Sequence, residues 1–141
     1  QSPDDARVYD QLFYQQQSWR LETGDIDIAL QSMAERNDQS SRFCFLWAQL
    51  YMAKENTLKA FKKVKEALYQ WDLERNQPDP LELRPQLEDI LSLLVDICQQ
   101  LEKPKESLHF LARYLKENKS AEPKFWKRYE QLLSQVAPLQ F

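Results

Sequence analysis

The chain has 141 residues, of which 43% are hydrophobic and 29% are charged, a balance typical of one folded domain and too apolar for disorder. Its formal net charge of −3 predicts no general attraction to nucleic acid or to an anionic membrane, and no stretch approaches the roughly 18 apolar residues of a membrane span. The single glycine, Gly24, argues against the turns of sheets and against phosphate-binding loops. We therefore expect an all-α protein without strands.

Only two cysteines occur, Cys44 and Cys98, each in an apolar stretch. They are too few for a disulfide framework and are not spaced as a metal-binding pair. We expect two reduced, buried thiols and no metal or other cofactor, which favours a cytoplasmic or nuclear location. The first residues contain neither an initiator Met nor a signal-peptide pattern, so we expect the chain to be part of a longer protein.

Apolar residues recur at helical spacing along nearly the whole chain, which predicts about seven antiparallel helices. Four are expected before the first proline-rich stretch, at about residues 4–22, 25–36, 41–54 and 57–75. Gly24 is expected to end the first of them as a left-handed cap.

The stretch 76–80 is the clearest boundary, because residues before Pro78 and Pro80 avoid the helical conformation. We interpret it as a hinge between helices within one domain, 1–141, since neither half has enough surface to bury alone. Three more helices are expected: one from Pro80 or Pro85 to Leu101, one at about 104–118, and one from Pro123 to near Pro138. In the last, Phe125, Trp126 and Tyr129 are expected to pack inward and the neighbouring lysines to face solvent.

Two parts of the chain share a register: counted from Cys44 in one and from Leu91 in the other, residues of similar kinds recur at the same spacing. The first set is Cys44, Trp47, Ala48, Tyr51, Ala60, Val64 and Ala67, and the second is Leu91, Leu94, Val95, Cys98, Ser107, Leu111 and Tyr114. The pattern resembles the tetratricopeptide repeat (TPR), in which small residues let two antiparallel helices approach closely. The resemblance implies a TPR-like α-solenoid, with repeat-like units at about 10–43, 41–74 and 88–121 and a C-terminal capping helix at about 122–137. An irregular helical bundle with accidental periodicity is the alternative.

Such repeats form a curved wall whose first helices line a concave groove that holds a peptide or helix. The resemblance therefore implies a scaffold or adaptor that binds another protein. By position, the groove side would show Gln11, Tyr14, Ser18, Arg42, Phe45, Gln49, Asp89, Ser92 and Asp96. Phe45 is the leading candidate among them, because it lies off the main packing stripe; packing against a neighbouring helix is the competing interpretation.

No constellation typical of catalysis is present, and the single histidine, His109, has no cysteine or carboxylate at ligand spacing. We therefore expect no enzyme. Two alternatives to the interaction module stay open. One is a self-associating domain that dimerises through its aromatic-rich ends. The other is a nucleic-acid-binding helical repeat, suggested by two basic groups, Lys54, Lys59, Lys62, Lys63 and Lys65, and Lys124, Lys127 and Arg128 among aromatic residues.

Overall fold

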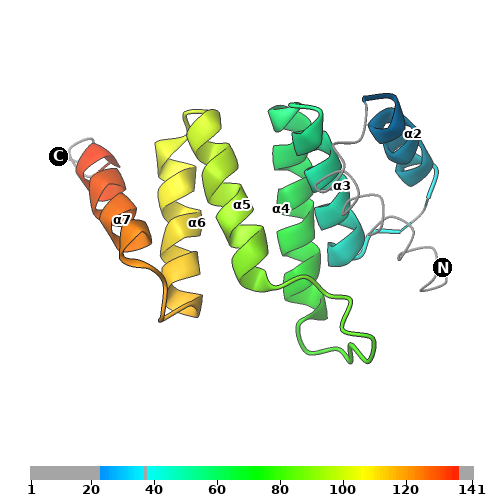
Figure 1. Cartoon of the computed structure of the whole chain (residues 1–141). Coiled ribbons are helices and arrows are strands. Elements are labelled where there is room, and N and C mark those ends of the chain that lie inside the picture. Colours follow the sequence, from blue (N-terminus) through cyan, green and yellow to red (C-terminus); the bar gives the residue numbers. More distant parts are fainter. Residues whose placement is uncertain (1–22, 37, 137–141) are drawn as a thin grey trace. The chain divides into compact units, whose positions relative to one another are not determined.

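The computed structural model describes residues 23–36 and 38–136. Within these ranges it contains six α-helices and no strand (Figure 1). The helices are α2 (Thr23–Ala34), α3 (Ser41–Ala53), α4 (Thr57–Glu74), α5 (Leu87–Gln100), α6 (Pro104–Glu117) and α7 (Pro123–Val136). The all-α prediction is thereby confirmed for the described residues, and the helix expected at about 4–22 lies outside them. Of the two expected starts of the fifth helix, Pro85 is the nearer, since α5 begins at Leu87.

The chain divides into two compact units, Gln1–Pro85 and Gln86–Phe141. In the first unit α2 packs on α3, and α3 packs far more extensively on α4. In the second unit α5 packs on α6 and α6 packs on α7. Each helix thus packs mainly on its neighbours in sequence, and the short connections 54–56 and 101–103 make the paired helices antiparallel.

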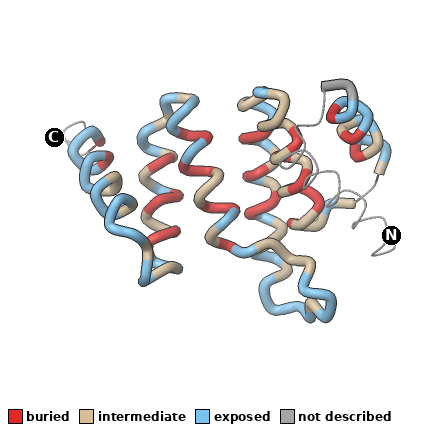
Figure 2. Tube along the Cα trace, in the orientation of Figure 1, coloured by how far each residue is buried: buried red, intermediate tan, exposed pale blue. Residues whose placement is uncertain are grey.

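The first unit has its core on both sides of α3. On one side, α2 and α3 bury a cluster of Ile26, Ala29, Met33, Phe43, Leu46 and Leu50. On the other, Ala48 of α3 and Ala60, Val64 and Ala67 of α4 are fully buried. Three of these four are alanines, so the two helices can approach closely, as the residue pattern predicts. Figure 2 shows the buried positions along the facing sides of α3 and α4.

The second unit is centred on α5. Its side chains Ile90, Leu91, Leu94, Ile97 and Cys98 are fully buried, and they recur at the three- and four-residue spacing of one helix face. The positions buried in α7 are Leu132 and Val136. Trp126 follows Phe125, and Leu133 follows the buried Leu132. Successive residues of an α-helix point about 100° apart around its axis, so Trp126 is turned away from the core and is 46% exposed. The expectation that Trp126 packs inward is wrong, whereas Phe125 does contact Tyr114, with 4.9 Å between ring centroids.

The two helical hairpins are closed by the same kind of turn. After α3, Glu55 has a left-handed backbone (φ 59°), and the N–H groups of Asn56 and Glu55 donate to the carbonyls of Tyr51 and Met52, both at 2.9 Å. This is the Schellman arrangement, which satisfies the last carbonyls of a helix. It recurs after α5 at Glu102 (φ 54°), with bonds from Lys103 to Cys98 at 2.9 Å and from Glu102 to Gln99 at 3.1 Å.

Gly24 does not have the expected role of a left-handed cap. It lies in the first turn of α2, and no glycine within the described ranges has a positive φ. The left-handed positions are occupied by glutamates instead, at Glu55, Glu82 and Glu102. The prediction failed because it assumed that the left-handed conformation follows glycine, whereas helix α2 already begins at Thr23.

The non-helical connection after α4 is held by side chains. The carboxylate of Asp79 accepts hydrogen bonds from the backbone N–H groups of Leu83 at 3.0 Å and Arg84 at 3.1 Å. The indole N–H of Trp71 donates to the carbonyl of Pro85 at 3.0 Å. These bonds fix the backbone in a segment whose prolines exclude a helix.

Glu74, the last residue of α4, joins this connection to the start of α3. It accepts hydrogen bonds from the backbone N–H of Ser41 at 2.9 Å and from its hydroxyl at 2.7 Å. It also lies 3.7 Å from the guanidinium of Arg84. Because Ser41 is fully buried, this carboxylate satisfies groups that water does not reach.

Candidate functional site: a pocket beside helix α3

The groove residues expected from the sequence lie in three separate parts of the chain. Gln11, Tyr14 and Ser18 are outside the described residues. Arg42, Phe45 and Gln49 lie on one face of α3 and are each half-buried. Asp89, Ser92 and Asp96 lie on one face of α5, in the second unit, and Asp96 is 3.5 Å from the guanidinium of Arg128. Each helix therefore brings its own three residues together.

Arg42 is already engaged within the first unit. Burial lowers the pKa of its guanidinium from the ordinary value, and the negative charge of Asp79 acts in the opposite direction. Asp79 belongs to the connection after α4, so this connection contributes to the environment of the expected groove face. Its influence was not foreseeable from the repeat register, which has no counterpart for these residues.

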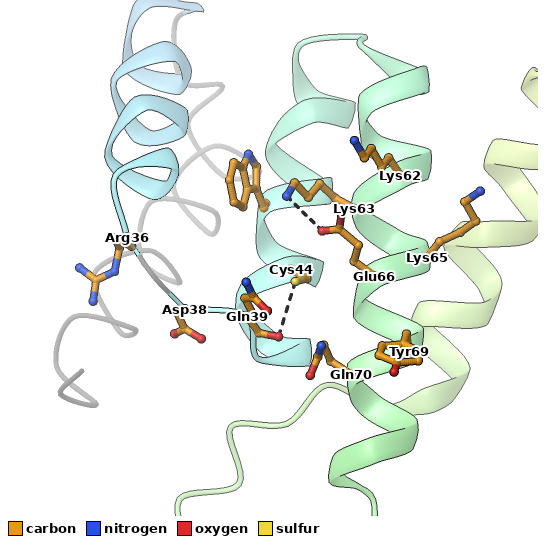
Figure 3. Close-up of a pocket in the computed structure, with 11 residues that line it drawn as sticks. Arg36, Asp38, Gln39, Cys44, Lys62, Lys63, Lys65, Glu66, Tyr69 and Gln70 are labelled. Carbon is orange, nitrogen blue, oxygen red and sulfur yellow. Dashed lines mark hydrogen bonds and ion pairs between the residues drawn. The ribbon is translucent and has the colours of Figure 1, made fainter.

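The first unit also contains a pocket of about 640 Å³. Its walls come from the segment after α2 and from helices α3 and α4, as Figure 3 shows. The lining side chains are Arg36, Asp38, Gln39, Cys44, Trp47, Lys62, Lys63, Lys65, Glu66, Tyr69 and Gln70. All of them lie within one compact unit, so the geometry of the pocket depends on that unit alone.

Cations outnumber carboxylates in the lining of this pocket. The lining contains four cations, Arg36, Lys62, Lys63 and Lys65, and two carboxylates, Asp38 and Glu66. Lys63 is 3.0 Å from Glu66. Lys65 extends to the opposite side of α4 in Figure 3, and its ammonium lies 4.3 Å from the ring centroid of Phe61. On the side of α4 toward α3, the cations of the lining are Lys62 and Lys63.

Trp47 supplies an aromatic wall. The ammonium of Lys63 lies 3.7 Å from the centroid of its ring, a cation–π contact, and the ring stacks on Tyr51 at 6.4 Å. The indole N–H of Trp47 is buried and has no hydrogen-bond acceptor within the described part of the chain. A buried donor without an acceptor costs about 1–3 kcal/mol.

Cys44 lies in the first turn of α3 and lines the same pocket as Trp47 and Lys63. Its thiol is 3.9 Å from the carbonyl oxygen of Gln39. Burial, followed by the negative charge of Glu66, raises its pKa to about 11. At neutral pH the thiol is therefore protonated, and it is a weak nucleophile.

The pocket and the expected groove lie on roughly opposite sides of α3. At 100° per residue, Cys44 and Trp47 are turned well away from the face formed by Arg42, Phe45 and Gln49. Sequence reasoning noted the lysines of α4 and the aromatic residues of α3 separately. The contact between Lys63 of α4 and Trp47 of α3 would have indicated the pocket. It could not be read from the sequence, because it depends on how the two helices pack.

A second pocket, of about 620 Å³, lies in the second unit between the start of α6 and helices α5 and α7. Its lining includes Cys98, Arg128 and the fully buried Ser107, whose hydroxyl has no hydrogen-bond partner among the described residues. Ser107 takes the small-residue position in the register that Ala60 takes in the first hairpin. Its burial is thus explained by the close contact of two helices.

Other chemical features of the described residues are few. No three His, Cys, Asp or Glu side chains in 23–36 and 38–136 lie close enough together to share a metal ion. His109 is exposed and contacts the ring of Phe110 at 5.4 Å. None of the described helices combines the length and apolar character that a membrane crossing needs.

The sequence matches no protein-family model and no curated protein, and the fold matches no solved structure. The arguments for function therefore rest on the geometry of this chain.

Proposed function

We propose that the chain is a non-catalytic protein–protein interaction module, a scaffold or adaptor that binds a peptide or helix of a partner protein. The observation that carries this proposal is the pocket between α3 and α4, with an aromatic wall at Trp47 and cations at its edge. Tyr69 at its rim is 64% exposed, and Leu73, one turn further along α4, is 57% exposed. Aromatic and basic side chains around a concavity are typical of surfaces that hold a protein segment.

The recurrence of one turn type supports the repeat-like part of the proposal. Glu55 and Glu102 close their hairpins in the same way, and each follows the fourth member of its register set, Tyr51 or Cys98, by four residues. We propose on this basis that α3–α4 and α5–α6 are related TPR-like units, with α7 as the capping helix. Within the first unit, the face of α3 with Arg42, Phe45 and Gln49 is a further candidate surface for a partner, and within the second unit the face of α5 with Asp89, Ser92 and Asp96 is another.

Self-association is a second candidate function, favoured by one observation. Trp126 and Leu133 are 46% and 38% exposed on the same side of α7, and large exposed apolar side chains often mark an interface. Nucleic-acid binding has less support, because three of the seven relevant lysines form ion pairs within the chain. Lys54 pairs with Asp27, Lys63 with Glu66 and Lys124 with Glu122.

Site-specific photo-crosslinking in living cells tests the proposal. A photoreactive amino acid replaces Gln70 in the pocket, Gln49 on the expected groove face, or Lys116, an exposed residue of α6 that serves as control. We expect one partner protein to crosslink at Gln70 and not at Lys116, and excess unlabelled chain to compete for it. Mass spectrometry of the adduct then locates the bound segment.

The other outcomes are equally informative. Adducts at Gln49 and none at Gln70 place the partner on the expected groove face. Adducts between two copies of the chain, and no others, favour the self-associating domain. Equal capture at Gln70, Gln49 and Lys116 contradicts a specific binding surface.

A further inference from the structure

We infer that the outer face of helix α4 binds an acidic amphipathic helix of a partner protein. This face consists of Leu58, Lys62, Lys65, Tyr69 and Leu73, all within the first unit. The inference rests on the proposed function, and it adds a further surface together with the chemistry of the partner.

Three large apolar side chains of α4 are left in solvent. Leu58 is 68% exposed, Tyr69 64% and Leu73 57%, and they are three of the four most exposed large apolar side chains within residues 23–36 and 38–136. At 100° per residue, the whole outer face spans only about 80° of the helix circumference. The fully buried Ala60 and Val64 lie on the opposite side of α4. The exposed apolar groups are therefore gathered on one side of the helix, as is typical of an interface.

The spacing of the outer face suits another helix. Its members follow one another at intervals of three or four residues. Lys65, Tyr69 and Leu73 are four residues apart, and such a row forms a ridge that fits between the side chains of a neighbouring helix. From Leu58 to Leu73 the face is about 22 Å long, which is about four helical turns.

The first half of the outer face is basic. Between Leu58 and Tyr69 the sequence of α4 contains four lysines and a single glutamate. That glutamate, Glu66, is paired with Lys63 at 3.0 Å. The other lysines are exposed and form no ion pair within the described part of the chain; they are Lys59, Lys62 and Lys65. Figure 3 shows Lys62, Lys65 and Tyr69 on this helix.

The nearby carboxylates do not cancel this positive charge. Asp38 lines the pocket together with Lys62, but its carboxylate accepts a hydrogen bond from the backbone N–H of Ser40 at 2.9 Å. Even if Asp38 is counted against one lysine, two lysines remain in excess. At the other end of the face, Asp72 and Arg75 carry opposite charges. The face therefore combines a basic half with an apolar half that has no net charge.

An acidic amphipathic helix matches both halves. Its apolar stripe would cover Leu58, Tyr69 and Leu73, and carboxylates beside that stripe would lie opposite the lysines. A nucleic acid or an anionic membrane fits less well, because the whole chain has a net charge of −3 and repels an extended polyanion. The attraction for carboxylates is local to α4, which favours a partner of similar size to that helix.

The test uses three designed helical peptides that share one stripe of leucines and carry glutamate, glutamine or lysine beside it. Fluorescence anisotropy of the labelled peptides measures their binding to the full chain. We expect the glutamate peptide to bind about tenfold more tightly than the glutamine peptide, and the lysine peptide to bind most weakly. The differences should shrink as salt is added. A glutamate peptide of scrambled sequence, without the leucine stripe, should bind about tenfold more weakly than the original.

Variants of the chain assign the binding to α4. The double variant Lys62→Glu, Lys65→Glu should weaken binding of the glutamate peptide about tenfold and strengthen that of the lysine peptide, a reversal that loss of folding cannot produce. Leu73→Ser should weaken binding of both peptides several-fold. The matched control Lys116→Glu, at an exposed position of α6, should leave both affinities within about twofold.

Failure of this inference is distinguishable from failure of the proposed function. Equal binding of the glutamate and glutamine peptides, or no reversal in the double variant, overturns the acidic-helix inference. Absence of peptide binding overturns it too, and sedimentation with phosphatidylserine vesicles then shows whether the face binds a membrane instead. The interaction module itself falls only when the crosslinking experiment shows no specific adduct.

Discussion

At the scale of single residues, burial decides the chemistry of Cys44. A thiol in water loses its proton near pH 8.5, whereas the protein environment raises the pKa of Cys44 to about 11. Because the folded chain disfavours the thiolate, the thiol contributes stability that is fully present below the ordinary pKa. That contribution is lost as the pH rises through the folded value.

We predict that Cys44 reacts slowly with iodoacetamide in the folded chain. At about pH 8, a thiol with a pKa of about 11 is roughly one part in a thousand thiolate, against about a quarter for an exposed cysteine. Labelling of Cys44, followed by mass spectrometry in the Cys98→Ser variant, should be about a hundredfold slower in the native than in the urea-unfolded chain. The rate should keep rising towards about pH 11, and a plateau near pH 8.5 would show that the pKa is not raised.

Glu66 gives this measurement an internal check. Its negative charge is the second cause of the raised pKa of Cys44, after burial. The Glu66→Gln variant should therefore label faster at a given pH, because the thiolate no longer faces that carboxylate. A control variant, Glu130→Gln on α7, should label at the rate of the unmodified chain.

At the scale of the helices and turns, two left-handed glutamates stand where a glycine is usual. Glu55 and Glu102 close the α3–α4 and α5–α6 hairpins with φ of 59° and 54°. Residues with a Cβ atom pay about 1 kcal/mol or more for this conformation, and glycine does not. Within residues 23–36 and 38–136, neither side chain forms a hydrogen bond or ion pair that offsets the cost.

We predict that Glu55→Gly and Glu102→Gly each raise the free energy of unfolding by about 1 kcal/mol. Urea denaturation followed by circular dichroism measures the change. Glu130→Gly, in the middle of α7, is the matched control and should lower the free energy of unfolding by about 1 kcal/mol. Loss of stability in all three variants would mean that the two turns do not need a left-handed residue.

The helices were predictable because their periodic apolar residues and prolines are local signals. Pro104 and Pro123 each open a helix in the structure, as proline at a first turn indicates. The side of α7 that faces the core was predicted less well. Trp126 is apolar, yet it lies beside the buried face of α7 and not on it. The packing of α7 on α6 decides which face of α7 is buried.

At the scale of the whole molecule, the division of the chain after Pro85 determines whether it unfolds in one cooperative step or in two. The sequence predicts one domain with a hinge, whereas packing separates two compact units, each with its own buried core. The residues between the repeat-like units 41–74 and 88–121 are mainly the connection between α4 and α5. The pocket at α3 could not be predicted at this scale, since it requires the relative placement of α2, α3 and α4.

We predict that a cavity in the second unit destabilises that unit and spares the first. Leu111 is 1% exposed, and its replacement by alanine should cost about 2–5 kcal/mol. In native-state hydrogen exchange read by mass spectrometry, Leu111→Ala should reduce protection in α5, α6 and α7 and preserve it in α3 and α4. Leu50→Ala, at a fully buried position of α3, should show the reverse.

The opposite result has a clear meaning. If either variant lowers protection in all helices equally, the two units unfold together. The single cooperative domain expected from the sequence is then the correct description.

The bond between Glu74 and Ser41 has a consequence for synthesis of the chain. The two residues are 33 positions apart, and Glu74 accepts from the first backbone N–H of α3. Because translation proceeds from the N-terminus, α3 leaves the ribosome without this acceptor and receives it only after the last residue of α4 has also left the ribosome. The hydrogen bonds at the start of α3 are therefore completed only once the end of α4 is present.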